Sequence, residues 1–214
     1  MSSAVFYETA KRVVIGLGYS HEIAWQATQR PQDIDETAFL REAAWVVYCC
    51  GFREAAVRRC FDFISLCFYD WISSDEIVAN RARCVSAAMH VLGNRRKHEA
   101  VVRIASRVGS EGFVCFRQNL LQSPVDTLRS LPFMGPVTAL HLAKNLGFDV
   151  AKPDRHLVRL GALLGFDDVS QMCRTIAAES GDPVRVVDLV LWRYMERKTA
   201  GAIDCSHSSV VAQE

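Results

Sequence analysis

The chain has 214 residues, of which 50% are hydrophobic and 23% are charged, and its formal net charge is +1. This length allows one large domain or two small lobes with a full core, and the composition is that of an ordinary globular protein. No apolar run approaches the roughly 20 residues of a membrane-spanning helix, and residues 13–17 are too few for a signal-peptide core, so we expect an intracellular protein.

Apolar residues recur at helical spacing along most of the chain, and no segment alternates in the manner of a strand. The expected helices span residues 4–15, 35–48, 53–68, 75 onward, 82–92, 97–108, 112–120, 124 to the turn at 132, 136 onward, 154–164, 169–178 and 183–198. Ser73 or Ser74 is expected to cap the helix that begins near residue 75. Residues 201–214 are expected to form a flexible tail. The sequence therefore predicts an all-α protein.

The stretch from residue 131 to residue 160 carries the strongest functional signal. Pro132, Gly135 and Pro136 predict a sharp turn, with Pro136 at the first helical position, where a missing N–H is tolerated. A tight turn that leads into a helix leaves free backbone N–H groups, which can bind a phosphate. Asp154 stands near the start of the next helix. A phosphate grip followed by a carboxylate indicates chemistry beside a nucleic-acid backbone.

This stretch resembles the helix-hairpin-helix DNA glycosylase superfamily. The matching residues are Leu131, Pro132, Gly135, Thr138, Ala139, Asp154, His156 and Arg159. Phe133 replaces the first hairpin glycine, as in the 3-methyladenine DNA glycosylase I branch, whereas that branch usually lacks an aspartate at the position of Asp154. The chain is thus similar to a mosaic of the two patterns.

The resemblance implies a two-lobed helical bundle with a DNA-binding cleft between the lobes. Residues 35–150 would form a six-helix-type lobe, with the helix-hairpin-helix motif at 124–146. Residues 1–34 and 151–200 would form the second lobe.

Asp154 is the expected catalytic residue. Removal of a base places positive charge on the sugar, and a carboxylate stabilises that charge and orients the attacking water. A role as helix N-cap is the alternative, and one side chain can have both roles. Relatives that cut the strand use a lysine at the position of Val137, so we expect a monofunctional glycosylase without a strong lyase step. Structural roles are expected for His156 and Arg159.

Contacts with the DNA backbone are expected from the hairpin and from a basic segment between residues 81 and 117. The candidates for these contacts are Leu131, Met134, Gly135, Thr138, Arg95, Arg96 and Lys97. In the resembling family, hairpin carbonyls often hold a monovalent cation. The alternative for the basic segment is a solvated helix face.

A flipped base needs aromatic faces to stack on and polar groups at its edge. The candidate pocket residues are Tyr19, Trp25, Glu42, Trp45 and Tyr48. In the 3-methyladenine branch a tryptophan is followed seventeen residues later by a glutamate, as Trp25 is by Glu42. Tryptophans and a carboxylate suit a cationic base, so an alkylated purine is the expected substrate. Core packing is the alternative for the aromatic residues. Phe52 and Tyr48 are candidates for the side chain that fills the gap left by the base.

The cysteines give no indication of a metal site. The eight cysteines include no C-x-x-C pair, and only Cys173 and Cys205 lie where some relatives hold an iron–sulfur cluster, so none is expected. Cys205 and His207 resemble part of the zinc site of the 3-methyladenine branch, but the N-terminal partner cysteine is missing. We therefore expect no cofactor other than the hairpin cation.

The sequence thus predicts a monomeric base-excision-repair DNA glycosylase that acts on double-stranded DNA containing a damaged base. It would work in the cytoplasm or nucleoid of a bacterium or in the nucleus of a eukaryote. Two alternatives stay open. One is a non-catalytic protein that binds DNA structures through the hairpin, and the other is a helical adaptor in which these residues form the core.

Overall fold

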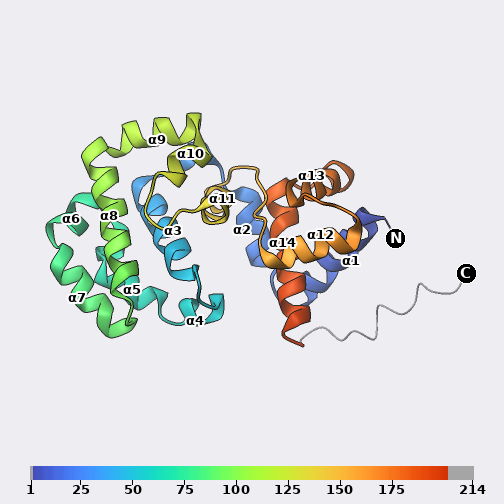
Figure 1. Cartoon of the computed structure of the whole chain (residues 1–214), viewed down its shortest axis with the longest axis horizontal. Coiled ribbons are helices and arrows are strands. Elements are labelled where there is room, and N and C mark those ends of the chain that lie inside the picture. The colour runs from blue at the N-terminus through green and yellow to red at the C-terminus, as the bar shows by residue number, and fades with distance from the viewer. Residues whose placement is uncertain (1, 202–214) are drawn as a thin grey trace, which may run out of the picture. The chain divides into compact units, whose positions relative to one another are not determined.

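The computed structural model of the protein describes residues 2–201, which form fourteen α-helices and two short 3₁₀-helices without a strand (Figure 1). The prediction of an all-α protein is therefore confirmed for the described residues. None of the described helices has the length and apolarity needed to span a membrane. Of the expected tail, residues 202–214 lie outside the described residues.

The chain divides into two compact units. Unit 2 is the continuous segment Gln29–Phe148, and unit 1 combines the residues up to Thr28 with those from Asp149 onward. The expected division placed residues 35–150 in one lobe, so the observed unit 2 begins six residues and ends two residues earlier.

Unit 1 is built around its C-terminal helix. Its helices are α1 (Ser3–Gly16), α2 (Ser20–Thr28), α12 (Arg155–Leu164), α13 (Val169–Ser180) and α14 (Val184–Thr199). Helix α14 packs against the other four, and Val187, Val190 and Leu191 of α14 are fully buried in the core of the unit. Helix α2 was not predicted, because Gln26 is its only buried residue and no apolar stripe marks it.

Unit 2 contains the remaining helices. They are η1 (Pro31–Asp33), α3 (Glu36–Cys49), α4 (Glu54–Arg58), α5 (Phe61–Cys67), η2 (Tyr69–Trp71), α6 (Ser74–Ala79), α7 (Arg81–Val91), α8 (Arg95–Glu111), α9 (Phe113–Gln122), α10 (Pro124–Arg129) and α11 (Pro136–Asn145). Helix α8 is the longest and packs against α3, α6, α7 and α9. Val101, Ile104 and Val108 on one face of α8 are buried, which leaves the opposite face to solvent.

The prediction of a single helix over residues 53–68 is wrong, because the helix is interrupted at Arg59 and Cys60, between α4 and α5. Neither glycine nor proline marks this break. Phe61, the first residue of α5, packs edge-on against Trp45 with ring centroids 5.0 Å apart and stacks near Trp71 at 6.0 Å. Tertiary packing of an aromatic side chain therefore coincides with a helix end that carries no local breaker.

Candidate functional site

The loop between α10 and α11 holds the predicted phosphate-binding turn. The N–H of Met134 donates to the carbonyl of Leu131 at 3.2 Å, which closes the turn, and Gly135 is the extended residue before α11. Pro136 has no N–H, and no side chain caps this helix. The N–H groups of Val137 and Thr138 are therefore the donors at this helix start that a phosphate would reach.

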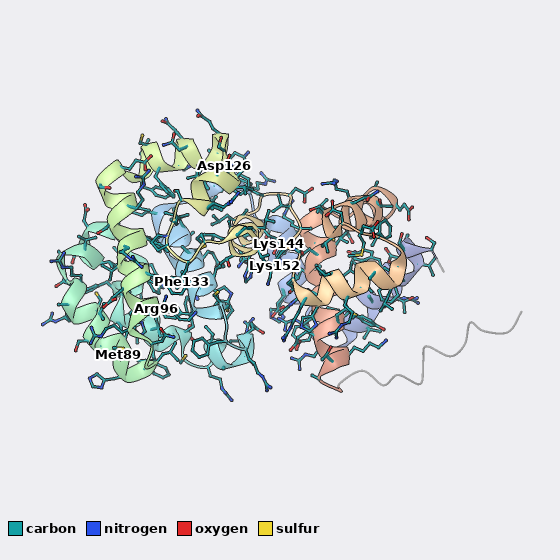
Figure 2. The ribbon with its side chains drawn as sticks, viewed as in Figure 1. Met89, Arg96, Asp126, Phe133, Lys144 and Lys152 are labelled. Atoms are coloured by element: carbon teal, nitrogen blue, oxygen red, sulfur yellow. The ribbon has the colours of Figure 1, made fainter. Side chains whose placement is uncertain are left out.

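Phe133 stands in the middle of this loop with a φ of 65°. This left-handed conformation costs a residue with a side chain about 1–2 kcal/mol, and glycine would avoid the cost. The ring is held by two cations of α8: the Arg96 guanidinium lies 6.0 Å and the Lys97 ammonium 5.6 Å from its centroid. Figure 2 shows Phe133 and Arg96 next to each other, where the loop passes the N-terminal end of α8.

A groove of about 800 Å³ opens beside Phe133, between α7 and α8. A smaller hollow of about 520 Å³ shares Phe133 with it and extends along Ser130 and Pro132. The charged side chains that line the larger groove are Arg81, Arg95, Arg96, Arg103 and Glu99. Its apolar lining comes from Ala82, Val85, Val102 and Phe133.

The charge of this groove is strongly positive. Glu99 lies 3.9 Å from Arg95, a long and exposed pair that contributes little. Within the described part of the chain, Arg81, Arg96 and Arg103 form no ion pair. Arg95 and Arg96 were expected DNA contacts, whereas Arg81 and Arg103 were not among the candidates. The spacing of seven residues between Arg96 and Arg103 places both on one face of a helix, and this spacing could have indicated Arg103 from the sequence.

The structure corrects the expected contact of Lys97 with the DNA backbone. Lys97 was expected to act with Arg95 and Arg96, but it is only 4% exposed. Its ammonium donates to the carbonyls of Val47, of Tyr48 at 3.3 Å and of Cys50 at 2.5 Å. These carbonyls lie at the C-terminal end of α3, where no following helical turn provides donors. Lys97 thus caps α3 inside the unit and does not face a DNA backbone.

Three of the candidate pocket residues lie on α3. Burial raises the pKa of Glu42, although the amide of Asn145, which donates to Oε2 at 3.0 Å, and the nearby Arg41 act in the opposite direction. Trp45 lies one turn further and is partly exposed, with the Arg58 guanidinium 5.5 Å from its ring. Glu42 and Trp45 therefore share one face of α3.

The structure also corrects the expected role of Tyr48 in the base pocket, because Tyr48 is fully buried and cannot line an open pocket. Its hydroxyl donates to Nδ1 of His98 at 2.8 Å, and Nε2 of His98 donates to the carbonyl of Leu92 at 2.7 Å. The same burial removes Tyr48 as the gap-filling side chain. Phe52, the other candidate, is 40% exposed and remains available for that role.

The other two pocket candidates belong to unit 1. Trp25 is 41% exposed on α2. Tyr19 lies just before α2, with the guanidinium of Arg193 4.4 Å and that of Arg197 5.1 Å from its ring. Arg193 also pairs with Glu22 at 2.7 Å, so Tyr19 belongs to a network of charged and aromatic groups within this unit.

Asp154 is the N-cap of α12 in unit 1. Its Oδ1 accepts hydrogen bonds from the N–H groups of His156 at 2.9 Å and Leu157 at 3.1 Å. Its Oδ2 lies 3.6 Å from the ammonium of Lys152, and 14% of the side chain is exposed. The carboxylate is therefore fixed in orientation but still reachable from solvent.

Side chains of α14 contact the loop before Asp154. The N–H of Lys152 donates to Oδ2 of Asp188 at 2.7 Å, and Asp188 is 1% exposed. The ammonium of Lys152 lies 5.8 Å from the ring of Trp192, also on α14. The sequence does not indicate Asp188 as a positioning residue, because its contact with Lys152 joins segments far apart in the chain.

His156 and Arg159 were expected to have structural roles. The buried Nδ1 of His156 has no hydrogen-bond partner among the described residues, and Arg159 is exposed. No cluster of three or more histidine, cysteine or acidic side chains suited to a metal ion occurs between residues 2 and 201. The Cys205 and His207 considered for zinc lie outside the described residues.

Comparison of the chain with protein-family models, with curated proteins and with solved structures finds no match.

Proposed function

We propose that the protein is a DNA glycosylase of base excision repair, which flips a damaged base out of double-stranded DNA and hydrolyses its N-glycosidic bond. The proposal depends above all on Asp154, whose carboxylate is oriented by two backbone N–H groups and remains partly exposed. A carboxylate held in this way can stabilise the positive charge that develops on the sugar and can orient the attacking water.

Unit 2 supplies features that suit the DNA backbone. The N–H groups of Val137 and Thr138 stand at a helix start without a side-chain cap, and Arg96 and Arg103 line a basic groove nearby. The proposal assigns contacts with the DNA backbone to this surface of unit 2 and the chemistry to Asp154 of unit 1. Because Val137 occupies the position of the lyase lysine, we expect base release without strand scission.

The proposed substrate is an alkylated purine. Such a base carries positive charge and leaves easily, so it needs little acid catalysis. Glu42 has lost much of its hydration, which raises its pKa, and a cation that enters beside it would favour the charged form of its carboxyl. The partly exposed ring of Trp45 offers a π-face one turn away.

The test is a panel of duplex oligonucleotides that each carry one lesion: an alkylated purine, an oxidised guanine or a mismatched base. Base release is measured separately from strand scission, before and after alkali. We expect the protein to release the alkylated purine and to leave the strand intact until alkali is added. Absence of release from every lesion, with duplex binding intact, would overturn the proposal.

One observation favours the second candidate, a protein that binds DNA structures without catalysis. Lys152 lies 3.6 Å from Oδ2 of Asp154 while Oδ1 caps α12, so both oxygens already have structural contacts. Under this alternative, wild type and Asp154→Asn would bind DNA equally, and neither would release a base. A helical adaptor differs from both, because it would lack the steep loss of DNA affinity with salt that phosphate contacts produce.

A further inference from the structure

We propose that the groove between α7 and α8 binds unpaired nucleotides of a DNA strand, with phosphates on its arginines and a base against the ring of Phe133. The site lies wholly within unit 2, and it does not depend on base removal by Asp154.

The arginines have the arrangement that a strand of phosphates needs. Arg96 and Arg103 are two turns apart on one face of α8, which corresponds to a separation of about 10 Å along the helix axis. At this separation the two guanidinium groups can contact phosphates of different nucleotides in one strand. Arg81 adds a third guanidinium from α7. The groove therefore follows a chain of negative charges better than it fits a single anion.

The groove also has an apolar lining, which a ligand made only of phosphates would not need. Val85 and Val102 line it together with the ring of Phe133, and its volume of about 800 Å³ is far larger than a phosphate group. A ligand that gains from both features has a flat apolar body and attached negative charge. Nucleotides combine the two, and single-strand binding sites pair a basic groove with an aromatic side chain on which a base stacks.

The partly exposed ring of Phe133 indicates that the ligand is an unpaired strand and not a duplex. A duplex can place its phosphates on the arginines, but the faces of its bases are covered by their neighbours, so the ring of Phe133 would have no base to stack on. An unpaired base exposes its face, and Phe133 is a partly exposed ring that borders both hollows of this surface. The ring is kept there in a left-handed backbone conformation that a glycine would adopt without cost, which is typical of positions where the side chain has a task.

The test measures fluorescence anisotropy of a labelled oligothymidylate with the full chain over a series of salt concentrations. The variants are Phe133→Leu, Phe133→Tyr and Arg103→Gln. The matched control is Arg107→Gln, because Arg107 lies one turn further on α8, outside the groove, where it pairs with Glu111 at 3.2 Å. Thermal unfolding of each variant establishes that it is folded.

We expect Phe133→Leu to weaken oligothymidylate binding about 5- to 150-fold with an unchanged salt slope, since it removes stacking but no charge. Phe133→Tyr should bind as wild type does. Arg103→Gln should weaken binding and lower the salt slope by about 0.7, the value for one phosphate contact on a single strand. Arg107→Gln should change neither quantity.

Three results would overturn the assignment. Equal effects of Arg103→Gln and Arg107→Gln would mean that the groove is not where the phosphates bind. An unchanged affinity of Phe133→Leu would exclude base stacking. Thymidine monophosphate that binds as tightly as the oligothymidylate would mean that the site takes a free nucleotide and not a strand.

Discussion

Two neighbouring residues of α8, Arg96 and Lys97, are expected to respond in opposite ways to the same substitution. Arg96 is exposed and lines the basic groove, whereas Lys97 is buried and donates to the carbonyls at the end of α3. Substitution by methionine keeps a long flexible side chain but removes the charge and the donors. Lys97→Met should therefore destabilise the protein, and Arg96→Met should weaken DNA binding.

The expected magnitude for Lys97→Met follows from its contacts. A buried acceptor left without a donor costs about 1–3 kcal/mol, and the ammonium serves three carbonyls. The variant no longer desolvates an ammonium, which offsets part of this cost. We expect a net loss of about 2–4 kcal/mol in the free energy of unfolding, or about 5–15 °C in melting temperature. Arg96→Met should stay within about 0.5 kcal/mol of wild type, as surface substitutions usually do.

The pH dependence adds a second signature. Burial lowers the pKa of Lys97, while Cys50 and Cys49 act weakly in the opposite direction. The unfolded chain therefore binds this proton more tightly, and the contribution of Lys97 to stability rises with pH from the lowered folded pKa up to about 10.4, the value of a free lysine. Lys97→Met should remove that rise.

The assays are denaturant unfolding at several pH values and duplex affinity as a function of salt. Arg96→Met should lower the salt slope by about 1, and Lys97→Met, measured where it is folded, should keep the slope of wild type. A Lys97→Met protein as stable as wild type, with a reduced salt slope, would refute the assignment of Lys97 to the core.

Two further predictions concern stability. Glu42→Gln should stabilise the protein at pH 7, because the raised pKa of Glu42 means that its contribution is present at low pH and is lost as pH rises from about 4.3 through the folded pKa. Denaturant unfolding at pH 4 and pH 7 measures this, and a variant less stable than wild type at pH 7 would contradict it. Gly147→Ala should cost about 3 kcal/mol or more, because the added Cβ would lie 2.7 Å from the backbone of Gln29 and φ is +90°. Gly181→Ala, with φ +80° but open space around the Cβ, should cost only about 1–2 kcal/mol, and equal losses for the two glycine variants would count against the steric argument.

The helical pattern predicted much of the fold, because most helices bury an apolar stripe, and six of the fourteen described α-helices begin at a residue whose side chain caps them. Ser73 caps α6 and Asp154 caps α12, as their sequence context indicated. The pattern failed for α2, which buries a glutamine, and at the break between α4 and α5, which coincides with the packing of Phe61. Both failures involve contacts between segments distant in the chain.

The candidate site was predictable to a smaller extent. A basic segment could be recognised, but whether a lysine or arginine faces solvent depends on the rotation of its helix. Lys97 is in register with the buried residues Val101, Ile104 and Val108, whereas Arg96 is in register with Arg103 on the groove side. The helical register of this segment would have distinguished Arg96 from Lys97 on the sequence alone. The support of Lys152 by Asp188 could not have been predicted, because α14 lies far from this loop in the chain.

Base removal is proposed to depend on the carboxylate of Asp154, and single-turnover base release by Asp154→Asn measures that dependence. Asparagine keeps an N-cap acceptor for the N–H groups of His156 and Leu157, so the fold and the affinity for DNA should be preserved. We predict that the rate of release of an alkylated purine falls at least about 100-fold, in line with the loss of a group that acts on the transition state. An Asp154→Asn protein that releases the base at the rate of wild type, with equal DNA affinity, would contradict the account and leave Asp154 as a helix cap.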